Sequence, residues 1–415
     1  MQFEIVEINT GLPLLLSPAQ GTPRMALAVV MHGGTLREEQ AGVARLASRL
    51  LMKGTASRSA ETLAREVEER GIDLREVTLP DCALLLAVFL NRELPTVLTL
   101  LADILFHSTF VDFQKEAVRL AGEIQSSLDQ PAEQAQDLLG RLLFADFPYG
   151  NTGRRVLEAL PTLTEDQIRA WHFDGLNPRR MNVALVGDFD TDAVRPLLEA
   201  TFADLVDMPP GAAAPVLTGI ARDRVATEAR TEAQQAQLYQ GWYAPPMGAP
   251  EQAAVAVMNT ILGGAGMSSR LFTELRDKQG LAYSVRSSYL PMGVVGELQL
   301  SIGTSPENID RARRGFADQL ARLQQEPVTA QELQQATGRL HGSYVLSHET
   351  NRQQCLDMAL NHIQGLGPDY SETLLQHIDG VTIAEVQTAA QLFSSPSATA
   401  IVARDAALVG IVTTE

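Results

Sequence analysis

The sequence predicts an α+β protein of two similar domains, each with a mostly antiparallel sheet covered by helices on one face. Three observations carry this expectation. The chain has 415 residues, of which 45 % are hydrophobic, enough for two cores. A stretch rich in Pro, Gly and Ala, residues 207–219, lies near the midpoint and is typical of a linker. The halves 1–206 and 220–415 also repeat one order of elements.

The repeat begins with a strand followed by a helix. In the first half, the apolar run 24–32 ends at Gly33-Gly34, and a helical pattern begins near Gln40. In the second half, residues 237–243 form a β-favouring run that ends at a Pro-rich turn, and a helix is expected from about Pro250.

Each half also closes in the same way. Residues 163–168 carry the signature of a capped helix, and the strand-like run 181–187 follows. Residues 381–386 and 399–404 repeat that order in the second half. The sequence therefore indicates a weak duplication of a whole domain.

Composition and charge exclude several classes of function. The formal net charge of −17 disfavours nucleic acid as a partner. The longest apolar runs, such as 82–90, are far shorter than the roughly 20 residues that span a bilayer, so no membrane partner is expected. Met1-Gln-Phe-Glu-Ile-Val lacks a basic region followed by an apolar one, which favours the cytoplasm. Cys82 and Cys355 are expected to be buried thiols.

Two neighbouring stretches near the N-terminus are informative: Gly33-Gly-Thr-Leu-Arg-Glu38, and residues 42–55, which end in Lys-Gly-Thr. Their frame resembles the zinc helix of the pitrilysin and mitochondrial processing peptidase family, whose inverted zinc motif reads His-x-x-Glu-His. Histidines at i and i+4 chelate one zinc ion there, and the glutamate deprotonates the metal-bound water. Arg45 and Arg49 replace the two histidines here, and Ser48 replaces the base. A guanidinium cannot ligate a metal, so no metal and no catalysis are expected in this chain.

A second segment, 113–124, resembles the part of that family that supplies the third zinc ligand. The resemblance implies that Glu123 matches the ligand and Glu116 its supporting carboxylate. Both positions would be vestigial, and two exposed helix glutamates are the simpler interpretation. A sharper hypothesis is that Arg45 or Arg49 pairs with Glu116 or Glu123 and fills the vacated site.

The third and most specific segment, 262–285, predicts a helix that ends at Gly280 and a strand from Tyr283 to Tyr289. In the family, an Arg and a Tyr seven residues apart reach the catalytic site of the other half and hold the substrate. The resemblance assigns that role to Arg276 and Tyr283, whereas spacing alone would favour a surface Arg and a core-facing Tyr. The run Gly263-Gly-Ala-Gly266 is expected to be a flexible turn that opens the helix, not a phosphate loop.

The resemblance implies a non-catalytic, substrate-binding subunit of a heterodimeric zinc peptidase, with a processing-peptidase-like fold. A partner chain with His-x-x-Glu-His would hold the zinc, and a peptide would be the substrate. One alternative is a scaffold subunit resembling the core proteins of a respiratory complex. Another is a hydrolase with a different metal site, for instance around His341 and His348. Residues 29–32 are expected to lie on an edge strand that could dock a peptide.

Overall fold

The computed structural model describes residues 2–206, 208 and 215–414, which form two compact units. Most of the predicted linker, residues 207 and 209–214, lies outside the described residues. The first unit comprises Met1–Glu123, Arg155–Pro215 and Leu346–Ser371, and the second comprises Ile124–Arg154, Val216–Val345 and Glu372–Glu415. The units therefore differ from the expected domains, because one segment of each half belongs to the unit built mainly by the other half.

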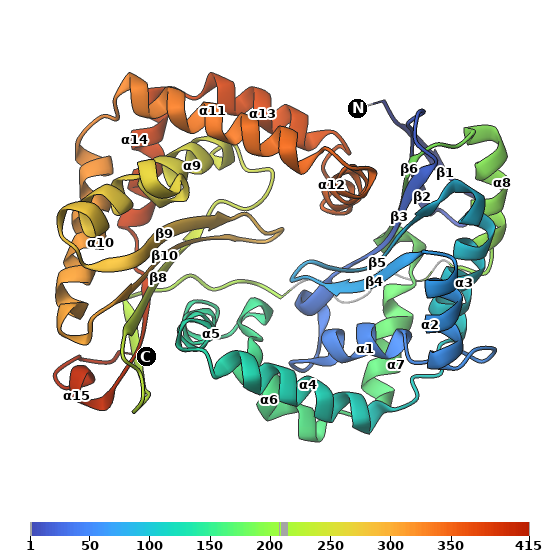
Figure 1. The fold of residues 1–415 in the computed structure, drawn as a ribbon, viewed down its shortest axis with the longest axis horizontal. Coiled ribbons are helices and arrows are strands. Elements are labelled where there is room, and N and C mark those ends of the chain that lie inside the picture. Colours follow the sequence, from blue (N-terminus) through green and yellow to red (C-terminus); the bar gives the residue numbers. More distant parts are fainter. Residues whose placement is uncertain (1, 207, 209–214, 415) are drawn as a thin grey trace. The chain divides into compact units, whose positions relative to one another are not determined.

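The first unit is built on a six-stranded sheet in the order β1-β2-β6-β3-β5-β4, drawn mostly in blue in Figure 1. All neighbouring strands are antiparallel except β2 and β6. The strands are β1 (Glu4–Glu7), β2 (Pro13–Pro18), β3 (Arg24–His32), β4 (Asp73–Thr78), β5 (Cys82–Leu90) and β6 (Met181–Gly187). Its helices are α1 (Val43–Leu51), α2 (Ala60–Glu69), α3 (Leu94–His107), α7 (Glu165–Gly175), α8 (Thr191–Thr201) and α12 (Asn351–Ile363).

The second unit has a five-stranded sheet in the order β7-β11-β8-β10-β9, in which only β7 and β11 are parallel. Its strands are β7 (Arg224–Ala229), β8 (Ala236–Ala244), β9 (Ala282–Leu290), β10 (Gly296–Thr304) and β11 (Ala398–Ala403). Its helices are α5 (Pro131–Leu143), α9 (Gln252–Asn259), α10 (Ile309–Gln325), α14 (Ile383–Gln391) and α15 (Asp405–Leu408). Four further helices run across the boundaries between the units: α4 (Phe113–Leu128), α6 (Gly153–Ala159), α11 (Ala330–Ser347) and α13 (Tyr370–Gly380).

The two sheets confirm the repeat that the sequence indicated. Removing β1 leaves the order β2-β6-β3-β5-β4, which matches β7-β11-β8-β10-β9 strand for strand, including the position of the parallel pair. The predicted helix starts at 164 and 382 are both capping boxes, formed by Thr164 with Gln167 and by Thr382 with Glu385. The α+β class with two mostly antiparallel sheets is confirmed.

The expectation that helices cover only one face of each sheet is wrong. In the first unit, α12 packs on β3 and β6, where Cys355, Met358 and Ala359 join a buried cluster with Ala28 and Val30. Met31 points to the opposite face, where Gly175 of α7 lies so close that a Cβ there would be 3.3 Å from its sulfur. Both faces of β3 are therefore buried.

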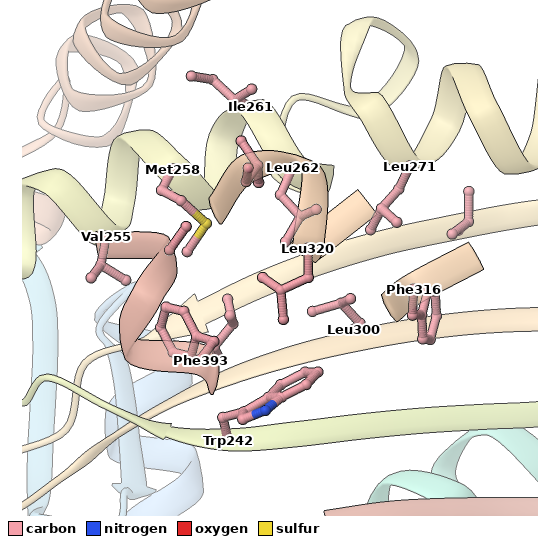
Figure 2. Close-up of a cluster of buried hydrophobic side chains, with 14 of the residues drawn as sticks. Trp242, Val255, Met258, Ile261, Leu262, Leu271, Leu300, Phe316, Leu320 and Phe393 are labelled. Atoms are coloured by element: carbon pink, nitrogen blue, oxygen red, sulfur yellow. The ribbon is translucent and has the colours of Figure 1, made fainter. Parts of the chain in front are cut away.

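Helix α5 has the corresponding place in the second unit (Figure 1), where it packs on β7, β8 and β11. A Cβ on Gly241 of β8 would meet Leu139 and Leu143 of α5 at 3.2–3.3 Å, so the helix lies close to the strand. The Tyr243 hydroxyl donates to the Leu143 carbonyl over 2.7 Å. The other face of this sheet carries the core shown in Figure 2, in which Trp242 and Leu300 meet Met258, Phe316 and other side chains of the covering helices.

Strand β3 is also not an edge. It lies between β6 and β5, and residues 29–31 are paired on both sides, so the expectation of an edge strand that docks a peptide is wrong. At the two ends of the order lie β1 and β4 in the first sheet, and β7 and β9 in the second. Among the described residues, no helix has the length and apolar character needed to cross a bilayer.

Residues 346–371 are the segment of the second half that belongs to the first unit. Residues near both of its ends contact one carboxylate of α12, that of Asp357. The Ser371 hydroxyl donates to it over 2.6 Å and the Asn361 amide over 3.2 Å. His348 Nε2 lies 3.1 Å from the same carboxylate, before the helix starts. Asp357 therefore ties the entry and the exit of the segment together.

We predict that Asp357→Asn lowers the free energy of unfolding by about 1–2 kcal/mol, because it weakens two hydrogen bonds to one charged acceptor and removes the ion pair with His348. Urea denaturation at pH 7 measures the change. Asp379→Asn is a matched control, since Asp379 pairs with His341 at an exposed position. This substitution should change stability by less than about 0.5 kcal/mol. Equal effects of the two substitutions would contradict the role of Asp357.

Candidate functional site

The helix in the position of the zinc helix, α1, forms without a side-chain N-cap. Gly42 precedes it with a φ of +95°, and one oxygen of Glu38 accepts hydrogen bonds from the backbone N–H groups of Gly42 and Ala44, both at 3.1 Å. Seven of its nine residues are buried. The two that are not are Arg45 and Arg49, one turn apart on the same face, where a zinc helix would present its histidines.

Arg49 reaches both carboxylates that the sequence singled out. Its Nη1 and Nη2 donate to the two oxygens of Glu123 over 2.8 and 3.0 Å, which is a bidentate pair. Nη2 also lies 3.5 Å from Glu116, whose side chain is only 3 % exposed. The pairing hypothesis is confirmed for Arg49. For Arg45, no hydrogen bond or ion pair occurs within the part of the chain that the structure describes.

Two cations that the sequence analysis did not single out complete this arrangement. Lys53 lies 3.0 Å from Glu116, and Arg119 donates to Glu123 over 3.2 Å. The spacing could have indicated both, because Lys53 is four residues after Arg49 and Arg119 lies between the two glutamates on one face of α4. Arg49, Lys53, Arg119, Glu116 and Glu123 are called the ion-pair ladder below.

The ladder has a clear electrostatic consequence. The bidentate hydrogen bonds from Arg49 hold the pKa of Glu123 below its ordinary value, and the same bonds raise the pKa of the Arg49 guanidinium. Both groups are therefore charged throughout the physiological range. The attraction replaces, with a fixed side chain, the charge compensation that a metal dication would give to these carboxylates.

The residues present do not fit a zinc ion. Zinc sites of this type need imidazole nitrogens with a carboxylate, and the arginines offer only N–H donors. The two carboxylates are already paired with Arg49, Lys53 and Arg119. Within the described residues, no three His, Cys, Asp or Glu side chains gather in a way that could hold a metal.

Ser48, in the position of the general base, is a buried structural residue. Its hydroxyl donates to the Ala44 carbonyl over 3.0 Å and accepts from the Thr78 hydroxyl over 2.9 Å. The first bond is the usual one for a serine inside a helix, and the second ties α1 to the edge strand β4. Ser48 therefore has neither the basicity nor the exposure to activate water.

The second group of candidate residues lies in the other unit, on one continuous piece of chain. Residues Phe272–Lys278 form a π-helical turn that ends at Gly280, whose φ is +63°, and β9 follows from Ala282. The Leu281 amide donates to the Leu275 carbonyl over 2.8 Å and closes the turn. The predicted helix end and strand are confirmed.

Arg276 and Tyr283 are brought together by this turn. The Arg276 guanidinium carbon lies 5.0 Å from the centre of the Tyr283 ring and 4.4 Å from that of Phe272. Tyr283 is 81 % exposed, so the alternative of a core-facing tyrosine is wrong. Phe272 is a neighbour that the spacing argument missed, although its position four residues before Arg276 could have indicated it.

The remaining sequence candidates form no joint site. His341 contacts Asp379 in the second unit, and His348 contacts Asp357 in the first. The glycine turn also differs from the expectation, because Gly263 is needed for close packing: a Cβ there would lie 2.3 Å from the Ser287 amide nitrogen. Both cysteines are buried free thiols, as expected, and burial raises the pKa of Cys82 to about 12.

Two family models match the chain, and both describe peptidase family M16. The model described as insulinase, peptidase family M16, matches residues 14–155, which include the ladder. The model described as the peptidase M16 inactive domain matches residues 162–340, which include Arg276 and Tyr283.

Similar proteins support the same assignment. The chain is 26 % identical to the uncharacterized zinc protease YmxG of Bacillus subtilis, over 95 % of this chain and 96 % of that protein. It is 29 % identical to an uncharacterized zinc protease of Mycobacterium tuberculosis, over 85 % of this chain and 81 % of that one. Among solved structures, a peptidase M16 inactive domain from Pseudomonas fluorescens matches with a TM-score of 0.90 at 21 % identity, covering 97 % and 98 % of the two chains. A protease from Helicobacter pylori matches with a TM-score of 0.88 at 19 % identity, over 97 % and 99 %.

We predict that Arg49→Ala lowers the free energy of unfolding by about 2 kcal/mol at pH 7, because it leaves Glu123 and the buried Glu116 undercompensated. Arg45→Ala is the matched control and should cost less than about 0.5 kcal/mol. Because Glu123 has a lowered pKa in the folded state, its contribution is present above its ordinary value of 4.5 and is lost as the pH falls through the folded value. The difference in unfolding free energy between wild type and Arg49→Ala, measured by urea denaturation, should therefore become smaller below about pH 4.5.

The combined substitution Arg45→His and Arg49→His should create a zinc site, because two imidazoles one turn apart would face the carboxylate of Glu123, which would then be paired with Arg119 alone among the cations of the ladder. At a zinc concentration of 100 times Kd, stability should rise by about 2.7 kcal/mol, measured by denaturation with and without zinc. Adding Glu123→Gln should weaken the effect. An equal stabilisation of the wild-type chain by zinc would show that the arginines do not block the site.

Proposed function

Because the chain belongs to peptidase family M16 and is of its non-catalytic type, with Arg45, Ser48 and Arg49 at the His-Glu-His positions, we propose that it is the substrate-binding subunit of a heterodimeric zinc peptidase. A partner chain supplies the His-x-x-Glu-His helix and its zinc ion. This chain supplies Arg276 and Tyr283 to the shared active site, and a peptide is the substrate.

The half-buried Arg276 beside the exposed Tyr283 is the observation that carries the proposal. Arg276 has no hydrogen bond or ion pair to the described residues through its side chain, and Tyr283 projects from the edge strand β9. A guanidinium N–H and a phenol O–H can both donate to a peptide carbonyl oxygen, which orients the peptide. The same donors stabilise the oxyanion that forms when water attacks that carbonyl.

The need for a partner follows from the ladder. The carboxylates that would serve a metal are held by Arg49, so the attacking water has to be activated by another polypeptide. We propose that the heterodimer works in the cytoplasm, because free thiols such as those of Cys82 and Cys355 persist there. A scaffold role is the second candidate. The ion-pair ladder favours this role because it links α1 to α4 without any ligand.

The test is reconstitution with the catalytic partner. Mixing this chain with a co-purifying M16 chain that carries His-x-x-Glu-His should give zinc-dependent peptidase activity that neither chain shows alone. Arg276→Ala with Tyr283→Phe should lower kcat/KM by about 100-fold, because two donors to the reacting carbonyl are lost. Initial rates on a quenched fluorescent peptide measure this change.

The control is Arg339→Ala, an exposed arginine on α11, which should leave kcat/KM unchanged. Full activity of the mixture after the double substitution would contradict the binding role and favour the scaffold. Peptide hydrolysis by the pure single chain that a chelator abolishes would contradict the proposal altogether.

A further inference from the structure

Arg276 is held by two aromatic rings and by no carboxylate of the described residues. Its guanidinium carbon lies closer to the Phe272 ring, at 4.4 Å, than to the Tyr283 ring, at 5.0 Å. Two acids of the same turn lie close to Arg276 in sequence. Glu274 is already engaged by Lys278 at 2.7 Å and by Arg322 at 3.5 Å, and Asp277 makes no ion pair with Arg276 in the described part of the chain. The rings therefore decide where the Arg276 head lies.

Contact with rings has a different effect on an arginine than an ion pair has. A carboxylate would use the N–H donors, whereas a ring attracts the cation through its π-electrons and leaves those donors unused. A guanidinium also lies well on aromatic faces because it is planar. The contact thus restricts the head of a long, flexible side chain while its hydrogen-bonding edge stays available to a ligand.

Phe272 is suited to act as the fixed member of this pair of rings. It is 9 % exposed and lies beside Leu271, which belongs to the core of the second unit (Figure 2). Tyr283, in contrast, is 81 % exposed on an edge strand, so solvent and ligand can both reach it. The Phe272 ring is therefore largely buried, whereas the Tyr283 ring is open to a ligand.

We infer that Phe272 is a positioning residue for substrate binding: its buried ring holds the Arg276 guanidinium beside Tyr283, with the N–H donors directed to a peptide carbonyl. The inference rests on the proposed function of Arg276. Phe272 itself does not contact the peptide and acts only through the arginine. Less side-chain entropy is then lost when the peptide binds, because the arginine is already restricted.

The experiment is a double-substitution cycle in the reconstituted heterodimer. Phe272→Leu keeps an apolar core side chain but removes the ring, and it should lower kcat/KM about tenfold. Phe272→Tyr restores the ring and should return kcat/KM to within about twofold of wild type. In an Arg276→Ala background, Phe272→Leu should have no further effect, since the two residues act as one unit. Phe393→Leu, a core phenylalanine packed on Trp242, controls for general loss of packing.

A second readout uses the isolated full chain and does not depend on activity. The Nε–H proton resonance of Arg276, assigned by its disappearance in Arg276→Lys, should be shifted upfield by the rings relative to that of Arg339. The shift should shrink in Phe272→Leu and persist in Phe272→Tyr. An unshifted resonance in the wild-type chain would overturn the inference.

The two readouts separate the possible failures. If Arg276→Ala leaves kcat/KM unchanged, the proposed function fails and the inference fails with it, even where the resonance is shifted. If Arg276→Ala lowers kcat/KM but Phe272→Leu does so equally with and without Arg276, the proposed function survives. In that case Phe272 is a packing residue only, and the inference is overturned.

Discussion

An ionic constraint links α1 to α4 in the first unit: the carboxylates of Glu116 and Glu123 need cations. Arg49 of α1 reaches both, and Lys53 lies closer to Glu116. Glu116 is almost fully buried, so an uncompensated charge there would be costly. A zinc ion and a guanidinium both meet that need. Only the metal carries an open coordination position for water, whereas the guanidinium offers N–H donors. The guanidinium therefore keeps an ionic link between α1 and α4 without the chemistry of a metal.

The exchange of helices between the halves has a simpler physical origin. Strand β3 reads Met-Ala-Leu-Ala-Val-Val-Met from Met25 to Met31, without the polar alternation of a sheet that is wet on one side. Both of its faces must be covered, and α12 covers the face that carries Ala28 and Val30. In the second unit, Gly241 lets α5 approach β8 in the corresponding place. Each half of the chain thus completes the core of the unit built mainly by the other.

The local rules of sequence predicted much of this architecture, and the failures have identifiable causes. Capping at Thr164 and Thr382, the glycine end at Gly280 and the closing strands all follow from neighbouring residues. The apolar run 24–32 could have predicted a strand buried on both faces, but not which helix covers it, because that helix begins at Asn351. The same limit applies to strand order. Position along the chain does not tell an edge strand from a central one, so the sequence of residues 29–32 does not reveal that they lie in the middle of the sheet.

The candidate site shows the same division between local and distant information. The family frame identified Arg49, Glu116, Glu123, Arg276 and Tyr283, but geometry was needed to distinguish Arg49, which is paired, from Arg45, which has no ion pair among the described residues. It also revealed that the retained arginine rests on rings and not on an acid. An arginine kept only for stability would gain most from a carboxylate, as Arg49 and Arg270 do. Among the described residues Arg276 has no carboxylate partner, which sets it apart from Arg49 and Arg270 and is consistent with the binding role proposed for it.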